Sequence, residues 1–361
     1  MNTISVCMIV KDEEAVLKRC LLCVKQFADE IIIVDTGSMD STKEIAKRYT
    51  DNIYDFPWNH DFSKARNFSF SKASMDYIFW LDADDVINKE DCEKILSLKK
   101  ELHHDVAAVM MKYVVSVDEN NRPLSYFYRE RMVKRENGLE WLGIVHECLN
   151  IKGNIVYSPI KIFHDPKKKK DVSRNLALYE KQKEKNITFS ARDLYYYGRE
   201  LYEHKEYQKA LSVLKQVLEK DTWIEYKIGT CEILGMIYQI LKDKENALLM
   251  YFQSFLYDEP RAEICCCIGE CFMHYEEYKK AVFWYQLALK RNRKDREGAF
   301  IREDCYGFLP SIQLCVCYWM LHDKEKSSYY HIALNILLFY IMKRYFSKKV
   351  HVFILRLLFC C

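Results

Sequence analysis

Short apolar runs alternate with helical patterns from the N-terminus to about residue 135, and this alternation constrains the fold more than any other feature. Four of the runs read as buried strands: 4–10 (ISVCMIV), 30–35 (EIIIVD), 77–82 (YIFWLD) and 106–117 (VAAVMMKYVVSV). Strands that alternate with helices predict an α/β domain of Rossmann type, with a mostly parallel sheet and helices on both faces. In such sheets, ligands bind beyond the carboxyl ends of the strands.

Acidic and small residues follow three of these strands, at 11–13 (KDE), 35–38 (DTGS) and 82–85 (DADD). Neighbouring carboxylates repel one another by roughly 4 kcal/mol per pair at about 4 Å, for an effective dielectric constant of about 20. In a strand, residues i and i+2 point the same way, so Asp82 and Asp84 are expected to share one side. Two carboxylates at a strand end suit a hard divalent cation such as Mg²⁺ or Mn²⁺, which would offset the repulsion.

From about Ser190 the pattern is helical throughout, and it repeats. Each of three glycines is followed twelve residues later by an alanine: Gly198 and Ala210, Gly235 and Ala247, Gly269 and Ala281. Small residues at these positions let paired helices approach closely, and the pattern resembles the tetratricopeptide repeat, an all-α solenoid. Cys315 and Ser327 have the same offset, which indicates a weaker fourth unit.

Charge and cysteine content limit the class of protein. The net charge of +3 gives no global case for binding nucleic acid. The cysteines number fifteen, an odd count, and lie mostly within helix and strand patterns. The chain also enters a strand at Ile4, which leaves no room for a secretory leader. Reduced thiols in the cytoplasm are therefore expected, and the CxxC of Cys20 and Cys23 is interpreted as apolar packing rather than a zinc site.

Three segments together resemble the family 2 glycosyltransferases, over roughly residues 3 to 100. They are SVCMIVKDEEAVLKRCL, EIIIVDTGSMDST and YIFWLDADD. The resemblance implies a GT-A fold and an inverting transfer from a nucleotide-diphospho-sugar. Further on, RMVKRENGLEWLGIVHECL resembles the acceptor-side segment of transferases related to lipopolysaccharide-core enzymes, which often carry tetratricopeptide repeats. Glycosyltransferases that modify bacteriocin peptides also join this domain to a helical one.

The resemblance implies roles for residues on the donor side. Asp35 would accept a hydrogen bond from the nucleotide base, and a uridine-diphosphate sugar is favoured over a guanosine one. Glu13 and the backbone near Val10 would line the base and ribose pocket. Arg66 would lie near the diphosphate, where a guanidinium fork suits phosphate oxygens. Its alternative interpretation is an exposed helix arginine.

The resemblance also implies a metal site and a base. Asp82 would face the ribose or the metal, and Asp84 would ligate Mn²⁺ or Mg²⁺. His164 is a candidate third ligand, although a structural histidine is an alternative. Glu147 is the candidate general base, which removes a proton from the acceptor as it attacks the anomeric carbon. His146 would orient Glu147 or lie in the core; the family more often has an acidic pair where this chain has His-Glu.

These interpretations predict four regions. They are a glycosyltransferase catalytic domain at 1–165, a linker with a connecting helix at 166–189, helical repeats at 190–335, and an apolar, basic tail at 336–361. The lysine run at 167–170 reads as solvated linker or as contact with an anionic ligand or membrane. The tail is expected to be a final helix, a membrane-surface anchor or an abnormal terminus.

The favoured acceptor is a peptide or protein side chain held by the repeats. The alternatives are a lipopolysaccharide-core, lipid-linked or other saccharide acceptor, with the repeats serving self-association as a homodimer or docking. A catalytically inactive repeat protein that only binds a partner is an alternative of another class. A nucleotidyltransferase is disfavoured, because KDEE stands at 11–14 where that class has a glycine-rich, arginine-containing loop.

Overall fold

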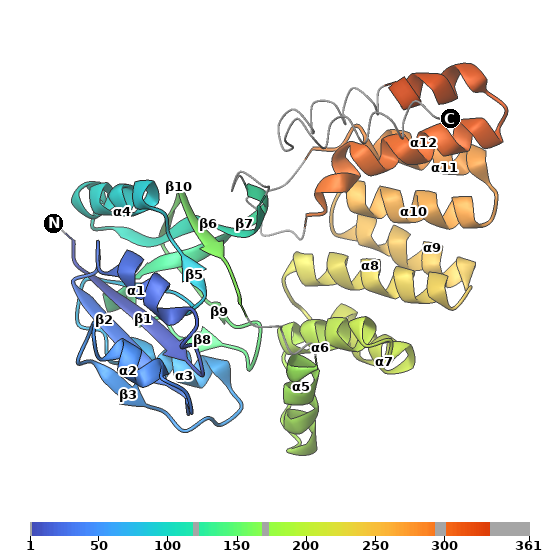
Figure 1. The fold of residues 1–361 in the computed structure, drawn as a ribbon. Coiled ribbons are helices and arrows are strands. Elements are labelled where there is room, and N and C mark those ends of the chain that lie inside the picture. Colours follow the sequence, from blue (N-terminus) through green and yellow to red (C-terminus); the bar gives the residue numbers. More distant parts are fainter. Residues whose placement is uncertain (1, 118–122, 168–172, 293–300, 333–361) are drawn as a thin grey trace. The chain divides into compact units, whose positions relative to one another are not determined.

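The computed structural model describes residues 2–117, 123–167, 173–292 and 301–332 (Figure 1). The chain divides into two units. The first comprises the residues up to Val117 together with Pro123–Ile187, and the second begins at Thr188. The two-part organisation expected from the sequence is therefore found, with its boundary at a different residue.

An eight-stranded sheet forms the centre of the first unit, in the order β3-β2-β1-β4-β7-β6-β10-β5. Its strands are β1 (Ile4–Val10), β2 (Glu30–Asp35), β3 (Ile53–Asp55), β4 (Tyr77–Trp80), β5 (Asp85–Val86), β6 (Val106–Val117), β7 (Pro123–Lys134) and β10 (Asn154–His164). Four of the seven pairings are parallel, and β7 lies antiparallel between β4 and β6. The strands β8 (Trp141–Leu142) and β9 (Cys148–Leu149) form a separate pair. The mostly parallel α/β fold is confirmed.

Helices cover both faces of this sheet. They are α1 (Leu17–Val24), α2 (Thr42–Ala46), α3 (Phe62–Phe70) and α4 (Lys89–Glu101). On one face, alternate strand residues such as Val6 and Met8 pack against Leu17 of α1 and Ile95 of α4. On the other face, Cys7 and its neighbours pack against α3 and the β8 segment. The period-2 alternation of the strands thus supplies two cores, one on each side.

The strand register brings three strand ends to one edge. Val10 pairs with Asp35, and Cys7 pairs with Trp80, so β1, β2 and β4 end near one another. Strand β4 ends at Trp80, and residues 82–85 form a turn in which the Asp85 N–H donates to the Asp82 carbonyl at 3.1 Å. The expectation that Asp82 and Asp84 share one side of a strand is wrong, because the chain has left the sheet before either residue.

Helix α5 (Arg174–Glu184) lies in the segment expected to link the domains, but it packs on the first unit. Tyr179 donates to the carbonyl of Val145 at 3.4 Å, and Lys181 lies 2.7 Å from the ring nitrogen of His60. The first unit therefore ends at Ile187, not at residue 165. Lysines 168–170 of the predicted linker lie outside the described residues.

Helix pairs make up the second unit (Figure 1). They are α6 (Ala191–Glu203) with α7 (Tyr207–Leu218), α8 (Ile224–Ile240) with α9 (Lys244–Gln253), α10 (Ala262–His274) with α11 (Tyr278–Ala288), and α12 (Phe308–Met320) with helical residues 324–332. In the last pair the Ser327 hydroxyl donates to the Cys315 carbonyl at 3.1 Å, so the predicted fourth unit is present.

The repeated glycines mark the closest approach within each pair. A Cβ atom added to Gly235 would lie 2.2 Å from the ring of Tyr251, and one added to Gly198 would lie 2.4 Å from Leu214. Gly269 faces Tyr285 in the same way, at 2.7 Å. The prediction that these glycines permit close packing is confirmed, although each glycine contacts the residue four positions beyond the alanine of its repeat.

Three further expectations concern the environment of the chain. Within the described ranges, no helix has the length and apolarity needed to cross a membrane. No disulfide joins the cysteines there, and burial raises the pKa of the Cys20 thiol well above its usual value, as expected for packing. The tail at 336–361 lies outside the described residues, so its predicted role, like self-association, stays a prediction.

Candidate active site

The loops after β1 and β2 are joined by hydrogen bonds that fix the first acidic cluster. The Val10 carbonyl accepts from the Thr36 N–H at 2.9 Å and from the Thr36 hydroxyl at 3.1 Å. The Glu13 N–H donates to the Thr42 hydroxyl at 2.6 Å. Asp12 has a φ of 54°, and its carboxylate accepts from a backbone N–H of the second loop at 2.7 Å. Val10 and Glu13 therefore lie beside the end of β2, at the edge where Asp35 is.

Asp35 is 1% exposed, and its two carboxylate oxygens differ in their hydrogen bonds. Its Oδ1 accepts the N–H groups of Gly37 and Ser38, both at 2.9 Å. Its Oδ2 is buried and has no hydrogen-bond partner among the described residues. A buried acceptor left unsatisfied costs about 1–3 kcal/mol, so a donor from a ligand is favoured at this oxygen.

Arg66 joins two other predicted site residues. Its Nε–H donates to Glu147 at 2.6 Å, and its Nη2–H donates to Asp82 at 2.8 Å. Burial alone would raise the pKa of Asp82, but the guanidinium groups of Arg66 and Arg131 outweigh burial and lower that pKa to about 2. Arg66 is therefore a partly buried bridging cation, and its alternative interpretation as an exposed helix arginine is wrong.

Two tryptophans hold the Arg66 guanidinium in place. It lies 4.9 Å from the ring centre of Trp80 and 5.1 Å from that of Trp141, and the two indoles meet edge to face. Arg131 and Arg129 of β7 also lie near Trp80, at 3.8 and 5.0 Å. The two tryptophans and the two arginines of β7 were not predicted as site residues from the sequence. The period-2 spacing of the two arginines in YFYRERMVK is the signal that indicates a strand there.

The candidate metal ligands that the structure brings together are Asp84, Asp85 and His164. One ligand atom from each lies within 4.8 Å of the others. The His164 Nδ1 is 3.5 Å from Asp84 and 3.7 Å from Asp85. Asp82 is not one of the three, because its carboxylate is turned to Arg66. The structure therefore replaces Asp82 by Asp85 in the candidate ligand set and brings Asp84 and His164 together.

This ligand set fits a divalent cation. The Asp85 Oδ1 and the His164 Nδ1 are both buried without a hydrogen-bond partner among the described residues. The other oxygen of Asp85 accepts from Arg131 at 3.0 Å, which orients the carboxylate. The carboxylates of Asp84 and Asp85 raise the pKa of His164 to about 10, so this position attracts positive charge. Two carboxylates and one imidazole suit Mn²⁺ well and leave coordination positions for a diphosphate.

Glu147 lies in a loop of unusual backbone conformation. Gly143 has a φ of 97°, and His146 has a φ of 55°, which is uncommon for a residue other than glycine. The Ile144 carbonyl accepts from the backbone of α3 at 2.9 Å. The His146 ring lies 3.4 Å from the amide of Asn175 on α5. The loop is thus held from two sides, and its strain is compatible with a functional position.

Comparison with known proteins identifies the first unit. The family model described as glycosyl transferase family 2 matches residues 5–181. Residues 5–181 form a glycosyl transferase family 2 domain. The resemblance found in the sequence is therefore confirmed, and α5 falls within the family match as well as within the first unit.

Two relatives are similar to parts of this chain. The SPbeta prophage-derived glycosyltransferase SunS of Bacillus subtilis (strain 168) is 29% identical over 280 residues, which is 72% of this chain and 64% of SunS. The TPR repeat-containing protein Synpcc7942_0270 of Synechococcus elongatus is 46% identical over 85 residues, which is 24% of this chain and 21% of that protein. The chain therefore spans less than two thirds of the length of either relative. A crystal structure of S. aureus TarS residues 1–349 with UDP-GlcNAc is also similar, with a TM-score of 0.39 and 13% identity over 92% of this chain and 90% of TarS.

Proposed function

We propose that this chain is an inverting glycosyltransferase that requires Mn²⁺ or Mg²⁺ and moves a sugar from a UDP-sugar to a peptide or protein side chain. The observation that carries the proposal is the cluster of Asp84, Asp85 and His164 at the edge of a glycosyl transferase family 2 domain. The partnerless oxygen of Asp35 lies at the end of β2, at the same edge of the sheet. The cytoplasm is the proposed compartment, since the described cysteines are free thiols.

The preference for uridine follows from the two oxygens of Asp35. One oxygen already accepts two backbone N–H groups, which leaves only Oδ2 for a base. Uracil presents a single ring N–H donor, which one oxygen satisfies. Guanine presents an N–H and an NH₂ group side by side, and these are best matched by both oxygens of a carboxylate. Val10, at the end of β1, and Glu13, in the loop after it, lie beside this position and would line the base and ribose pocket.

In the proposed reaction Glu147 takes the proton of the acceptor as the acceptor attacks the anomeric carbon. The bond between the sugar and the diphosphate breaks in the same displacement, so the anomeric configuration is inverted. Arg66 holds Glu147 and Asp82 at fixed positions relative to one another. A cation held by Asp84, Asp85 and His164 would stabilise the charge of the departing diphosphate.

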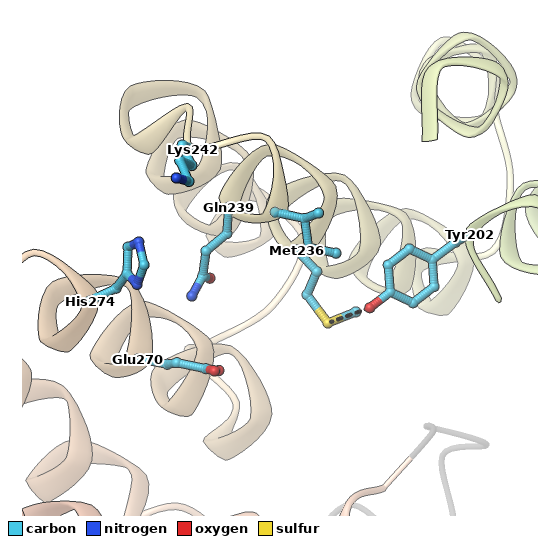
Figure 2. Close-up of a pocket in the computed structure, with 7 residues that line it drawn as sticks. Tyr202, Met236, Gln239, Lys242, Glu270 and His274 are labelled. Carbon is cyan, nitrogen blue, oxygen red and sulfur yellow. Dashed lines mark hydrogen bonds between the residues drawn. The ribbon is translucent and has the colours of Figure 1, made fainter. Parts of the chain in front are cut away.

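A groove in the second unit supports a peptide acceptor. Stacked helix pairs form extended surfaces that suit a polypeptide. A groove of about 340 Å³ lies between α6, α8 and α10. Figure 2 shows the side chains that line it. It is lined by Tyr202, Met236, Gln239, Ile240, Lys242, Glu270 and His274. The groove thus offers apolar and charged groups close together. Such a lining suits a bound amino-acid side chain that has an aliphatic stem and a polar end.

The similarity to SunS is compatible with this assignment. It covers 72% of the chain, more than the residues up to Ile187 account for, so it extends into the helical repeats. Part of the repeats therefore belongs to what the two chains share. Transfer to a saccharide or glycolipid is the competing outcome, in which the repeats serve docking alone.

The experiment is to incubate the full chain with radiolabelled UDP-sugars, Mn²⁺ and cell extract, and then to divide the product. Label that protease releases as glycopeptide supports the proposal. Label found only in the lipid or polysaccharide fraction contradicts the peptide acceptor, and no transfer with any donor contradicts the enzyme.

Groove variants test the acceptor side of the proposal. Ile240→Asp and Glu270→Lys change exposed groove residues and are expected to lower peptide labelling while release of UDP in the absence of acceptor is kept. Gln216→Ala, an exposed change on α7, is the matched control. Equal peptide labelling by all three variants would count against the groove.

A further inference from the structure

The three candidate ligands come from two segments that are far apart in the sequence. Asp84 and Asp85 follow β4, whereas His164 ends β10. The sheet joins these segments through only two residue pairs, Phe163 with Val86 and His164 with Asp85. Cation binding at this place therefore depends on how firmly the two segments are held together.

Arg19 of α1 contacts both segments. Its Nη1–H and Nη2–H groups donate to the carboxylate and the carbonyl oxygen of Asp165, the residue after His164. Its Nη2 also donates to the carbonyl oxygen of Asp84 at 3.5 Å. That oxygen accepts the Asp165 N–H at 3.0 Å. One guanidinium thus joins the end of β10 to the turn that carries Asp84.

We propose that Arg19 is a positioning residue, which sets the separation of Asp84 and His164 and so determines how tightly the site binds a divalent cation. The inference rests on the proposed function, which assigns the cation to this cluster. Arg19 is not a ligand itself, because a guanidinium offers only donors. Residues that orient metal ligands without touching the metal typically change its affinity by about 10–100-fold.

If Arg19 only stabilised the fold, its removal would lower the melting temperature of the cation-free protein. The exposure of its ion pair indicates otherwise. The side chains of Arg19 and Asp165 are 28% and 46% exposed. Ion pairs at such exposure contribute little to the free energy of unfolding. Removing Arg19 should therefore leave the melting temperature of the cation-free protein nearly unchanged while cation binding weakens. The weakening should be greater for Mg²⁺ than for Ca²⁺, because Mg²⁺ requires near-ideal octahedral geometry and Ca²⁺ does not.

The test is calorimetric titration of Mg²⁺, Mn²⁺ and Ca²⁺ into the full chain in the presence of UDP. For Arg19→Met we expect the Kd of Mg²⁺ to rise by about 10-fold or more, and that of Ca²⁺ to rise less. Lys18→Met is the matched control, since Lys18 is the exposed neighbour on the same helix, and it should keep the wild-type Kd. Melting temperatures with chelator report on the fold.

A second variant guards against misfolding of the first. Asp165→Asn keeps the shape of the partner and weakens the same contact, so it should shift the Kd of Mg²⁺ in the same direction. Combined with Arg19→Met it should add little, because Arg19→Met already removes the contact that Asp165→Asn weakens. Wild-type Mg²⁺ affinity in Arg19→Met would overturn this inference and leave the proposed cation site standing. If the unaltered chain binds none of the three cations with UDP, the proposed cation site fails and the inference fails with it.

Discussion

Arg66 donates its Nε–H to Glu147 at 2.6 Å, so the carboxylate proposed as general base is held by a guanidinium. The same guanidinium reaches Asp82 at 2.8 Å and lies 4.9 and 5.1 Å from the ring centres of Trp80 and Trp141. This cation therefore holds the proposed base, Glu147, in a fixed position relative to Asp82. The orientation of Glu147 is set by a residue from α3, far away in the sequence.

The first prediction concerns Glu147 as base. Glu147→Gln keeps the shape of the side chain but removes its ability to take a proton, so kcat with a serine peptide should fall by about 10²–10⁴-fold. With a matched cysteine peptide the loss should be much smaller, because a thiol has a pKa near 8.5 and needs less help from a base. The measurement is kcat with both peptides.

Glu140→Gln is the control for this variant, since Glu140 is exposed and precedes Trp141 in the same segment. It should leave kcat unchanged with either peptide. Full activity of Glu147→Gln with the serine peptide would show that another group accepts the proton.

The second prediction concerns the donor. Asp35→Asn removes the charge of the partnerless oxygen, and a hydrogen bond to a charged group is worth about 1.5–3 kcal/mol. The Kd of UDP with Mn²⁺ should therefore rise by about 10-fold or more, whereas Asp51→Asn, at an exposed position, should have no effect. Calorimetry with UDP and GDP measures both. Tighter binding of GDP than of UDP by the unaltered chain would show that Asp35 does not select uracil.

The third prediction concerns the repeats. In Gly235→Ala the new methyl group would lie 2.2 Å from the buried ring of Tyr251, and overpacking of this kind typically costs about 1–3 kcal/mol. Helical structure of the second unit should unfold at lower denaturant concentration. Ser212→Ala, at an exposed helical position, should change stability by no more than about 0.5 kcal/mol.

Release of UDP without acceptor should survive Gly235→Ala, because the first unit has cores of its own. Loss of that reaction in parallel with the helical signal would mean that the two units do not fold independently.

Much of the fold follows from local patterns, because buried strands and amphipathic helices have distinct periods. The apolar run that ends in WLDADD predicted β4, but apolar character alone does not say where a strand stops. Asp85 rather than Asp82 therefore joins Asp84 and His164. Strand β7 was not predicted, although the period-2 spacing of its arginines indicates a strand. The sequence does not show that Arg131 is buried there, paired with Asp85 and stacked on Trp80. A buried arginine has no sequence signal until its partners are known.

The C-terminal boundary of the first unit could not be predicted from the sequence either. Helix α5 has the composition of a solvated helix, and its contacts with His60 and Val145 come from loops distant in the chain. The glycine–alanine offset, in contrast, predicted the helix pairs correctly because the spacing itself imposes the close approach. The ring of Tyr251 against Gly235 is a detail that only the packed pair reveals.

In the proposed function, Asp84, Asp85 and His164 hold a divalent cation that the transfer reaction requires. The most direct measurement is the rate of UDP release from a panel of UDP-sugars with Mn²⁺, with chelator, and with Asp84→Asn in place of the unaltered chain. We expect Mn²⁺-dependent release from at least one donor, abolished by chelator and by Asp84→Asn. The melting temperature of Asp84→Asn in chelator should change by no more than about 2–4 °C, since the Asp84–His164 pair is partly exposed. Release at the same rate in chelator, or near-full release by Asp84→Asn with Mn²⁺, would contradict the proposed cation requirement.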